Sequence, residues 1–259
     1  MLVVISPAKK LDFSPSPPGL PATQPALEAE TEILAESTRK LTTKKLEKLM
    51  SISTTLAELN RARFQEMSFP TTPDNGKQAA LAFAGDTYLG LEATTLAPAD
   101  LEWAQSHLAI LSGLYGILRP LDLIQPYRLE MGSQLRTRRG KNLYAFWGKR
   151  LAARTNELTA DHRDRTVINC ASVEYWRGIR PELLSAGSIT PVFRENKGDE
   201  SKTIGFVAKR SRGMMARWIV QNRVETPEAI KDFREEDYVF QPRESTATEW
   251  VFTRASRTA

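Results

Sequence analysis

Short apolar runs bounded by turn residues alternate with longer segments of helical periodicity along this chain. The runs are 4 or 5 residues long, as buried strands are, and they lie at residues 2–5, 81–84, 108–111 and 166–170. Helical periodicity is found at residues 26–41, 98–107, 142–158 and 210–222. A strand hairpin is predicted at 189–193 and 203–208, and closing strands at 238–240 and 250–253. Because strands and helices interleave without a regular βαβ rhythm, we expect a mixed α/β (α+β) fold in one compact domain, residues 1–259.

The composition argues against a small protein held by disulfides or metal and against a secreted or membrane-spanning one. A chain of 259 residues can bury enough surface to fold without disulfide or metal staples. Its single cysteine, Cys170, forms no internal disulfide, and Cys170, His107 and His162 share no metal-ligand spacing. We therefore expect no metal site and no cofactor. The apolar run after Met1 is too short for a signal peptide or a spanning helix, so we expect a cytoplasmic protein without a membrane partner.

Charge is strongly segregated along the chain. Residues 36–63 carry seven basic and three acidic side chains, residues 131–180 carry eleven and four, and residues 201–224 carry six and none. Residues 81–130 are acidic by contrast, with two basic and six acidic side chains. A fold that gathers the basic stretches on one side produces a field that favours polyanions. The alternative is that each stretch is ordinary solvated surface.

Residues 43–67 outline a helix-hairpin-helix. Leu46 and Leu49 end one short helix, Leu56 and Ala57 begin a second, and Ile52 lies between them. In that motif the hairpin and the next helix N-terminus present backbone N–H groups to a DNA phosphate. Serine replaces both hairpin glycines here, so the expected phosphate ligands are hydroxyls and flanking lysines: Ser51, Ser53, Thr54, Lys44, Lys45 and Lys48. The alternative is a plain pair of capped helices, with Ser53 as a cap.

Two further stretches are rich in candidate anion ligands. The Gly-, Pro- and Tyr-rich segment 111–132 offers Arg119 and Arg128 at the wall of a cleft, but it contains neither GxGxxG nor GxxxxGK[ST]. Its arginines alternatively pair with Asp122 and Glu130. The segment 207–220 opens a helix with four cations that oppose the helix dipole, which indicates an external anion or a carboxylate partner. These four are Lys209, Arg210, Arg212 and Arg217.

Cys170 is a candidate for redox chemistry because it ends a predicted strand in a basic stretch. Basic neighbours depress a thiol pKa and make a thiolate that peroxide oxidises to a sulfenic acid. The alternative is an inert, buried thiol, which the apolar residues Val167 and Ile168 favour. Both histidines lie in polar surroundings, and we expect them to be solvated. No GxSxG or HExxH signature is present, so no catalytic residue is assigned.

Several long motifs resemble those of the peroxide-stress protein YaaA family. They are ISPAKKLDF at the start, FAGDTYLGLEA at 83–93, LSGLYGILRPLDLIQPYRLEMG at 111–132, NLYAFW at 142–147, NCASVEY at 169–175 and AKRSRGMMARWI at 208–219. The resemblance runs over nearly the whole chain. It implies a bacterial cytoplasmic protein of an unusual α/β fold with a basic groove, DNA binding through a helix-hairpin-helix, and a part in limiting free intracellular iron during oxidative stress. It supplies no catalytic roles.

Two hypotheses follow. In the first, the protein binds double-stranded DNA, mostly through backbone phosphates, and acts in peroxide defence. In the second, it is an enzyme acting on an anionic or phosphorylated small molecule in the basic groove. The expected groove residues are Lys9, Arg128, Glu174, Tyr175 and Lys209.

Overall fold

The centre of the molecule is a set of three adjacent parallel strands made mostly of apolar residues. The computed structural model describes residues 1–197 and 200–256. Strand β1 (Leu2–Ile5) is buried along its whole length and lies between β5 (Leu108–Ser112) and β8 (Val167–Cys170), both parallel to it. Strands that are covered on both faces are continuously apolar, which is why four consecutive apolar residues suffice for β1.

Within the described residues, these three strands belong to one eight-stranded sheet. Its order is β11-β12-β9-β8-β1-β5-β6, with β10 paired to the end of β9. Strands β12, β9, β8, β1 and β5 run parallel, while β6, β10 and β11 are antiparallel to their neighbours. The other strands of this sheet are β6 (Gly116–Leu118), β9 (Ser188–Lys197), β10 (Glu200–Lys202), β11 (Val239–Phe240) and β12 (Glu249–Ala255). Two small antiparallel pairs are β2 (Lys10–Leu11) with β4 (Phe83–Ala84), and β3 (Lys77–Gln78) with β7 (Leu123–Ile124).

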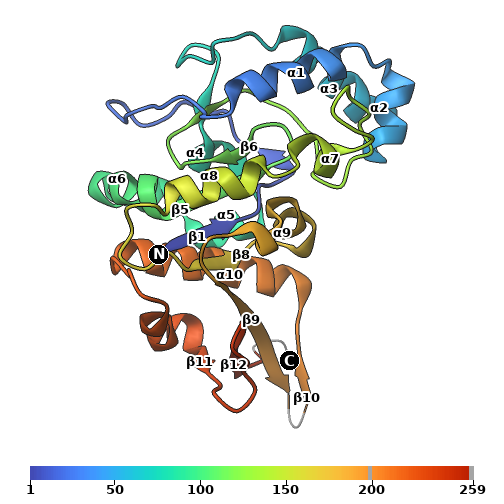
Figure 1. Cartoon of the computed structure of the whole chain (residues 1–259). Coiled ribbons are helices and arrows are strands. Elements are labelled where there is room, and N and C mark those ends of the chain that lie inside the picture. Colours follow the sequence, from blue (N-terminus) through green and yellow to red (C-terminus); the bar gives the residue numbers. More distant parts are fainter. Residues whose placement is uncertain (198–199, 257–259) are drawn as a thin grey trace.

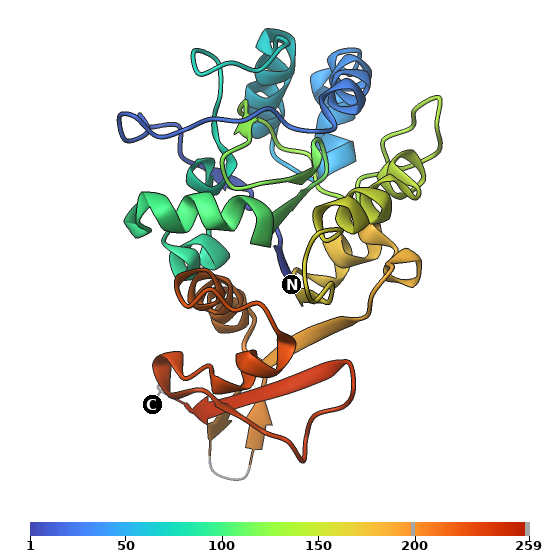
Figure 2. The same cartoon turned by 60° about the vertical axis from the view of Figure 1, so that its left-hand side comes forward.

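Helices cover the sheet and build the upper part of the molecule. Helix α10 packs against β1, β8 and β9, and α8 packs against β6; Figure 1 shows α8 in front of the sheet and α10 behind it. Helices α1, α2 and α3 gather at the top, whereas β9, β11 and β12 form the lower end in both views (Figures 1 and 2). The helices are α1 (Glu28–Arg39), α2 (Thr43–Met50), α3 (Thr54–Glu66), α4 (Ala79–Ala82), α5 (Asp86–Leu91), α6 (Pro98–His107), α7 (Leu143–Trp147), α8 (Arg150–Leu158), α9 (Val173–Ile179) and α10 (Gly205–Gln221).

The prediction of a mixed α/β fold in one compact domain is confirmed, but three element predictions are wrong. Residues 79–82 form helix α4, so only Phe83 and Ala84 of the predicted strand 81–84 are extended; alanine favours helix, and burial alone does not distinguish the two. The predicted helix 142–158 is broken at Gly148, which has a positive φ of 53°. The second hairpin strand ends at Lys202, and α10 begins at Gly205 instead of Arg210. No helix of the described residues is long and apolar enough to cross a membrane.

Helices α5 and α10 touch backbone to backbone. A methyl group added at Gly213 of α10 would overlap the carbonyl oxygen of Thr87 in α5, and one added at Gly90 of α5 would overlap the carbonyl oxygen of Arg210. Only glycine permits this approach on both sides of the contact. The contact holds the first turn of α5 beside the middle of α10. Both helices contribute side chains to the cleft described below, so the contact sets the position of one of its walls.

Replacing Gly213 by Ala should lower the free energy of unfolding by about 3 kcal/mol, because the added methyl group forces the two helices apart. Urea unfolding followed by circular dichroism measures the change. Gly205→Ala in the same helix is the matched control, since a methyl group there meets no atom within 4 Å. The control should change stability by less than about 1 kcal/mol, and equal losses in the two variants would contradict the close contact.

Candidate functional site

A cleft opens at the carboxyl ends of β1 and β8. Ser6 follows β1 directly. Cys170 is the last residue of β8, and Ser172 lies two residues after it. The chain leaves β1 toward β5 on one side and leaves β8 toward β9 on the other. A crevice forms where the connections of two adjacent parallel strands diverge, and ligands of open α/β sheets bind at such points.

The cleft is about 440 Å³ in volume and is lined by polar side chains from five segments. They come from the loop after β1, the start of α5, the loop 127–130, the start of α9 and the middle of α10. The charged residues of the lining are Lys9, Lys10, Asp86, Arg128, Glu130, Glu174, Lys209 and Arg212. Lys9, Arg128, Glu174, Tyr175 and Lys209, expected in one groove, are thus brought together here.

Two serines join the strand ends at the cleft. The Ser172 backbone N–H donates to Ser6 Oγ at 2.8 Å, and the Ser6 hydroxyl donates to Ser172 Oγ at 3.3 Å. The Tyr88 hydroxyl donates to the carbonyl oxygen of Ser6 at 3.1 Å, which ties α5 to the same point. These bonds hold two hydroxyl groups side by side at the carboxyl edge of the sheet.

Glu130 forms the acidic side of the cleft. Its Oε1 accepts from Arg128 Nε at 3.1 Å and lies 3.4 Å from Lys9 Nζ. Its other oxygen, Oε2, is buried and accepts no hydrogen bond from the described residues. The alternative predicted for Arg128, pairing with Glu130, is therefore confirmed, and one carboxylate oxygen is left over.

Glu174 and Tyr175 lie at the start of α9. Glu174 Oε1 accepts a hydrogen bond from the Gly132 backbone N–H at 2.8 Å, so this carboxylate anchors the loop 129–133. Burial raises the pKa of the Tyr175 hydroxyl well above its usual value, so Tyr175 is a neutral hydroxyl in the wall of the cleft.

The basic side of the cleft comes from α10. Lys209 is well exposed and lies 3.9 Å from Asp86 of α5. Arg212 projects from the next turn, and its Nε is buried without a hydrogen-bond partner. No carboxylate of the described residues lies within ion-pair distance of Arg212, so this guanidinium is a partly buried charge of the cleft without a counter-ion.

Cys170 lines the cleft but is only 1% exposed. Burial raises the pKa of its thiol to about 12, and the nearby positive charge of Arg212 offsets only part of that rise. The thiol is therefore protonated at neutral pH. The basic surroundings that motivated a redox role do not produce a thiolate here, and the burial matches the inert alternative.

Three other predicted anion ligands have partners within the protein. Arg119 lies outside the cleft and donates to Asp122 Oδ1 at 2.9 Å, as its predicted alternative had it. Arg210 pairs with Glu236, which also pairs with the buried Arg254. Arg217 donates to the carbonyl oxygens of Leu91 and Glu92 at 3.0 and 2.9 Å. Since α10 begins at Gly205, all four cations of this helix lie beyond its first turn, and the dipole argument does not apply to them.

The predicted hairpin at 43–67 consists of α2, a three-residue turn and α3. Ser51 ends α2 in the left-handed conformation, with φ 51° and ψ 54°, which is the conformation that a glycine would adopt most easily. Ser53 is the N-cap of α3, and its hydroxyl accepts from the Leu56 backbone N–H at 3.4 Å. Lys44, Lys45 and Lys48 are all exposed, and none forms an ion pair with any residue that the structure describes.

One cluster has no counterpart in the predictions. His107 and His162 stack with ring centroids 4.6 Å apart, and Trp103 stacks on His107 at 3.7 Å. The Met1 amino group lies 3.2 Å from His162 Nδ1. Burial, with the positive amino group as a further cause, lowers the pKa of His162 to about 4, so the prediction of solvated histidines is wrong. The two histidines are 55 residues apart in the sequence and are brought together by the fold, so no local sequence pattern predicts the pair.

Neither histidine lines the cleft. Within residues 1–197 and 200–256, no group of three or more His, Cys, Asp or Glu is placed to hold a metal ion.

The chain is thus a mixed α/β protein with a polar cleft at the carboxyl edge of a mainly parallel sheet, and comparison with known proteins gives its family. The family model described as peroxide stress protein YaaA matches residues 1–244. A UPF0246 protein of Magnetococcus marinus is 52% identical over 256 residues, covering 99% of this chain and 100% of the relative. UPF0246 proteins of Caulobacter vibrioides and Burkholderia mallei are 50% and 48% identical, each over 98% of this chain and at least 98% of the relative.

This protein therefore belongs to the peroxide stress protein YaaA family, as its motifs indicated. The family name supports a role in peroxide stress.

The histidine pair should make stability depend on pH. The pKa of His162 is about 6.5 in the unfolded chain and about 4 in the folded protein, so the unfolded chain binds a proton more readily. The contribution of neutral His162 to the free energy of unfolding is therefore complete above pH 6.5 and is lost as the pH falls toward 4. For this partly exposed site we expect a loss of about 1 to 2 kcal/mol, after a discount for solvent screening. Urea unfolding at pH 7 and 4.5 measures it. His162→Phe keeps an aromatic ring at this position and removes the titrating group, so the variant should lose less stability between pH 7 and 4.5 than the parent. Equal losses in the two proteins would contradict the assignment of the pH dependence to His162.

Proposed function

We propose that this protein binds double-stranded DNA, mostly through backbone phosphates, with the α2–α3 hairpin as its contact surface. The observation that carries the proposal is the state of Lys44, Lys45 and Lys48. All three are exposed on one short helix without an acidic partner in the described part of the chain. Lysines without ion pairs give up no existing interaction when they meet a phosphate, and they release the counterions that the phosphate holds.

The turn beside these lysines supports the same proposal. The left-handed Ser51 lets the chain reverse in three residues, so the end of α2 and the start of α3 lie close together. The N-terminus of α3 carries free N–H groups and a positive partial charge, and the side chains of Ser53 and Thr54 are exposed there. Lysines, hydroxyls and N–H groups together suit a backbone phosphate, and none of them reads a base edge.

The residues of α10 contribute less to this proposal. Arg210 and Arg217 already have partners within the protein, and Arg212 is partly buried in the cleft. Only Lys209 of this set is well exposed, with a side chain 59% accessible. The proposal therefore rests on the hairpin and not on α10.

We further propose that binding protects DNA in the bacterial cytoplasm during peroxide stress and that the protein helps to limit free intracellular iron. Both extensions rest on the family resemblance. They are chemically complementary, because ferrous iron reduces peroxide to hydroxyl radical, which attacks DNA.

Binding should depend steeply on salt. The logarithm of the affinity for a duplex should fall linearly with the logarithm of salt concentration, with a slope of about −0.9 for each phosphate contacted. Fluorescence anisotropy of a labelled duplex of arbitrary sequence, measured between low and physiological salt, gives the slope. A flat response, or no binding at low salt, contradicts the proposal.

Replacing Lys44, Lys45 and Lys48 together by Ala should weaken binding to unrelated duplexes about equally and reduce the size of the salt slope by about 2.7. Thermal stability should remain nearly unchanged, because exposed lysines contribute little to the fold.

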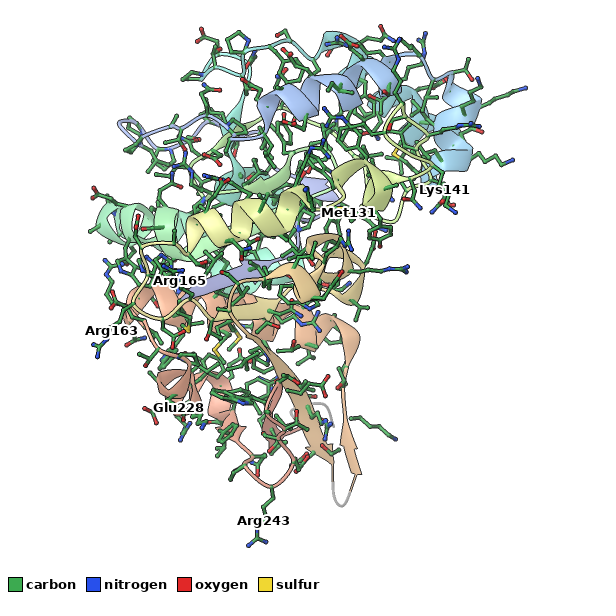
Figure 3. All side chains as sticks on the ribbon, viewed as in Figure 1. Met131, Lys141, Arg163, Arg165, Glu228 and Arg243 are labelled. Atoms are coloured by element: carbon green, nitrogen blue, oxygen red, sulfur yellow. The ribbon has the colours of Figure 1, made fainter. Side chains whose placement is uncertain are left out.

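The matched control is the triple alanine variant at Arg163, Arg165 and Arg243, which removes the same charge elsewhere. Figure 3 labels these residues at the left and lower ends of the molecule, away from α2 at the upper right. The control should bind DNA nearly as the parent does. If both triple variants lose the same affinity, binding follows total charge and the hairpin assignment is wrong.

A further inference from the structure

Two side chains that line the cleft at the carboxyl ends of β1 and β8 each carry a buried polar atom without a partner. One is a donor, Arg212 Nε, and the other is an acceptor, Glu130 Oε2; both are buried and neither has a hydrogen-bond partner among the described residues. No ion pair joins the two side chains to each other within the described part of the chain. A buried charged atom without a partner is costly, so such atoms indicate where a ligand supplies the missing interaction.

The charge of the lining indicates the charge of that ligand. Five cationic side chains and three carboxylates line the cleft, an excess of two positive charges. All three carboxylates are already engaged: Asp86 with Lys209, Glu130 with Arg128 and Lys9, and Glu174 with the Gly132 N–H. A phosphomonoester carries about −1.5 to −2 charges at neutral pH and matches this excess, whereas a single carboxylate does not.

The two orphaned atoms also indicate what else the ligand carries. Arg212 donates, so it suits the phosphate; the hydroxyls of Ser6 and Ser172 also line the cleft, and the charge of Arg212 acts on Cys170, two residues before Ser172. Glu130 Oε2 accepts, so it suits a hydroxyl donor on the remainder of the ligand. A phosphate joined to a hydroxyl-bearing carbon skeleton supplies both groups at once.

We propose that this cleft binds a phosphorylated sugar, with the phosphate at Arg212, Ser6 and Ser172 and a sugar hydroxyl donating to Glu130. The volume of about 440 Å³ lies within the range of small-molecule sites and is far too small for a duplex. The place is the one where open parallel sheets bind ligands. No residue of α2 or α3 lines the cleft, so this site is distinct from the proposed DNA surface.

Calorimetry on the full chain tests the proposal with ribose 5-phosphate as the probe and with inorganic phosphate and ribose as comparators. Ribose 5-phosphate should bind more tightly than inorganic phosphate, and ribose should show no binding. Arg212→Gln should weaken binding of ribose 5-phosphate at least tenfold. Glu130→Gln should reduce the preference for ribose 5-phosphate over inorganic phosphate, because the amide carries no negative charge and its nitrogen donates instead of accepting from the sugar hydroxyl.

Controls separate a specific site from general charge and from misfolding. Arg243→Gln removes the same charge at the lower end of the molecule and should bind as the parent does (Figure 3). Lys209 is exposed, so Lys209→Gln should fold even if Arg212→Gln does not, and it should weaken binding severalfold. Absence of binding by the folded parent at millimolar probe, or equal losses in Arg243→Gln and Lys209→Gln, overturns the proposal.

The same experiment distinguishes two sources of this chemistry. If an oligonucleotide with a 5′-phosphate displaces ribose 5-phosphate and its 5′-hydroxyl counterpart does not, the ligand is a DNA end; if neither displaces it, the ligand is a free metabolite. The triple alanine variant of α2 should retain ribose 5-phosphate binding. Its outcome therefore separates failure of this proposal from failure of the DNA proposal.

Discussion

The contact between α5 and α10 is the constraint on which the arrangement of the cleft depends. Glycines on both helices, Gly90 and Gly213, let the two backbones meet directly. The meeting places Asp86 beside Lys209 and brings Arg212 to the carboxyl ends of β1 and β8. Without this close approach α5 would stand farther from α10, and Asp86 would no longer lie beside Lys209 at the wall of the cleft.

The central part of the fold could be predicted from the sequence because its signals are local. Four apolar residues at 2–5 and the run ending at Cys170 predict buried strands, and both are found in the centre of the sheet. The start of α10 could not be predicted in this way. Residues 203–208 have the composition of a strand, but Gly205–Ala208 form the first turn of α10, a helix that packs against α5 more than 100 residues earlier in the chain.

The two candidate sites also differ in how far local sequence predicts them. The lysines of α2 and the hairpin turn follow from residues 43–54 alone. The cleft residues Lys9, Arg128, Glu174 and Lys209 were expected in one groove, and the structure brings them together. The roles of individual arginines depend on distant partners, however. Arg210 meets Glu236, whereas Arg212 meets no carboxylate among the described residues, and nothing in the spacing of these two arginines separates the cases. Arg119 differs, because its partner Asp122 lies three residues on and the sequence offered that pairing as an alternative.

The central functional claim is that DNA contacts the hairpin. Hydrogen–deuterium exchange with and without a saturating duplex tests this claim most directly, because it reads every segment of the unmodified protein in one experiment. The account predicts slower exchange in peptides that cover residues 43–55, where backbone N–H groups of α3 would meet a phosphate. Unchanged exchange at 43–55 together with protection elsewhere would contradict it.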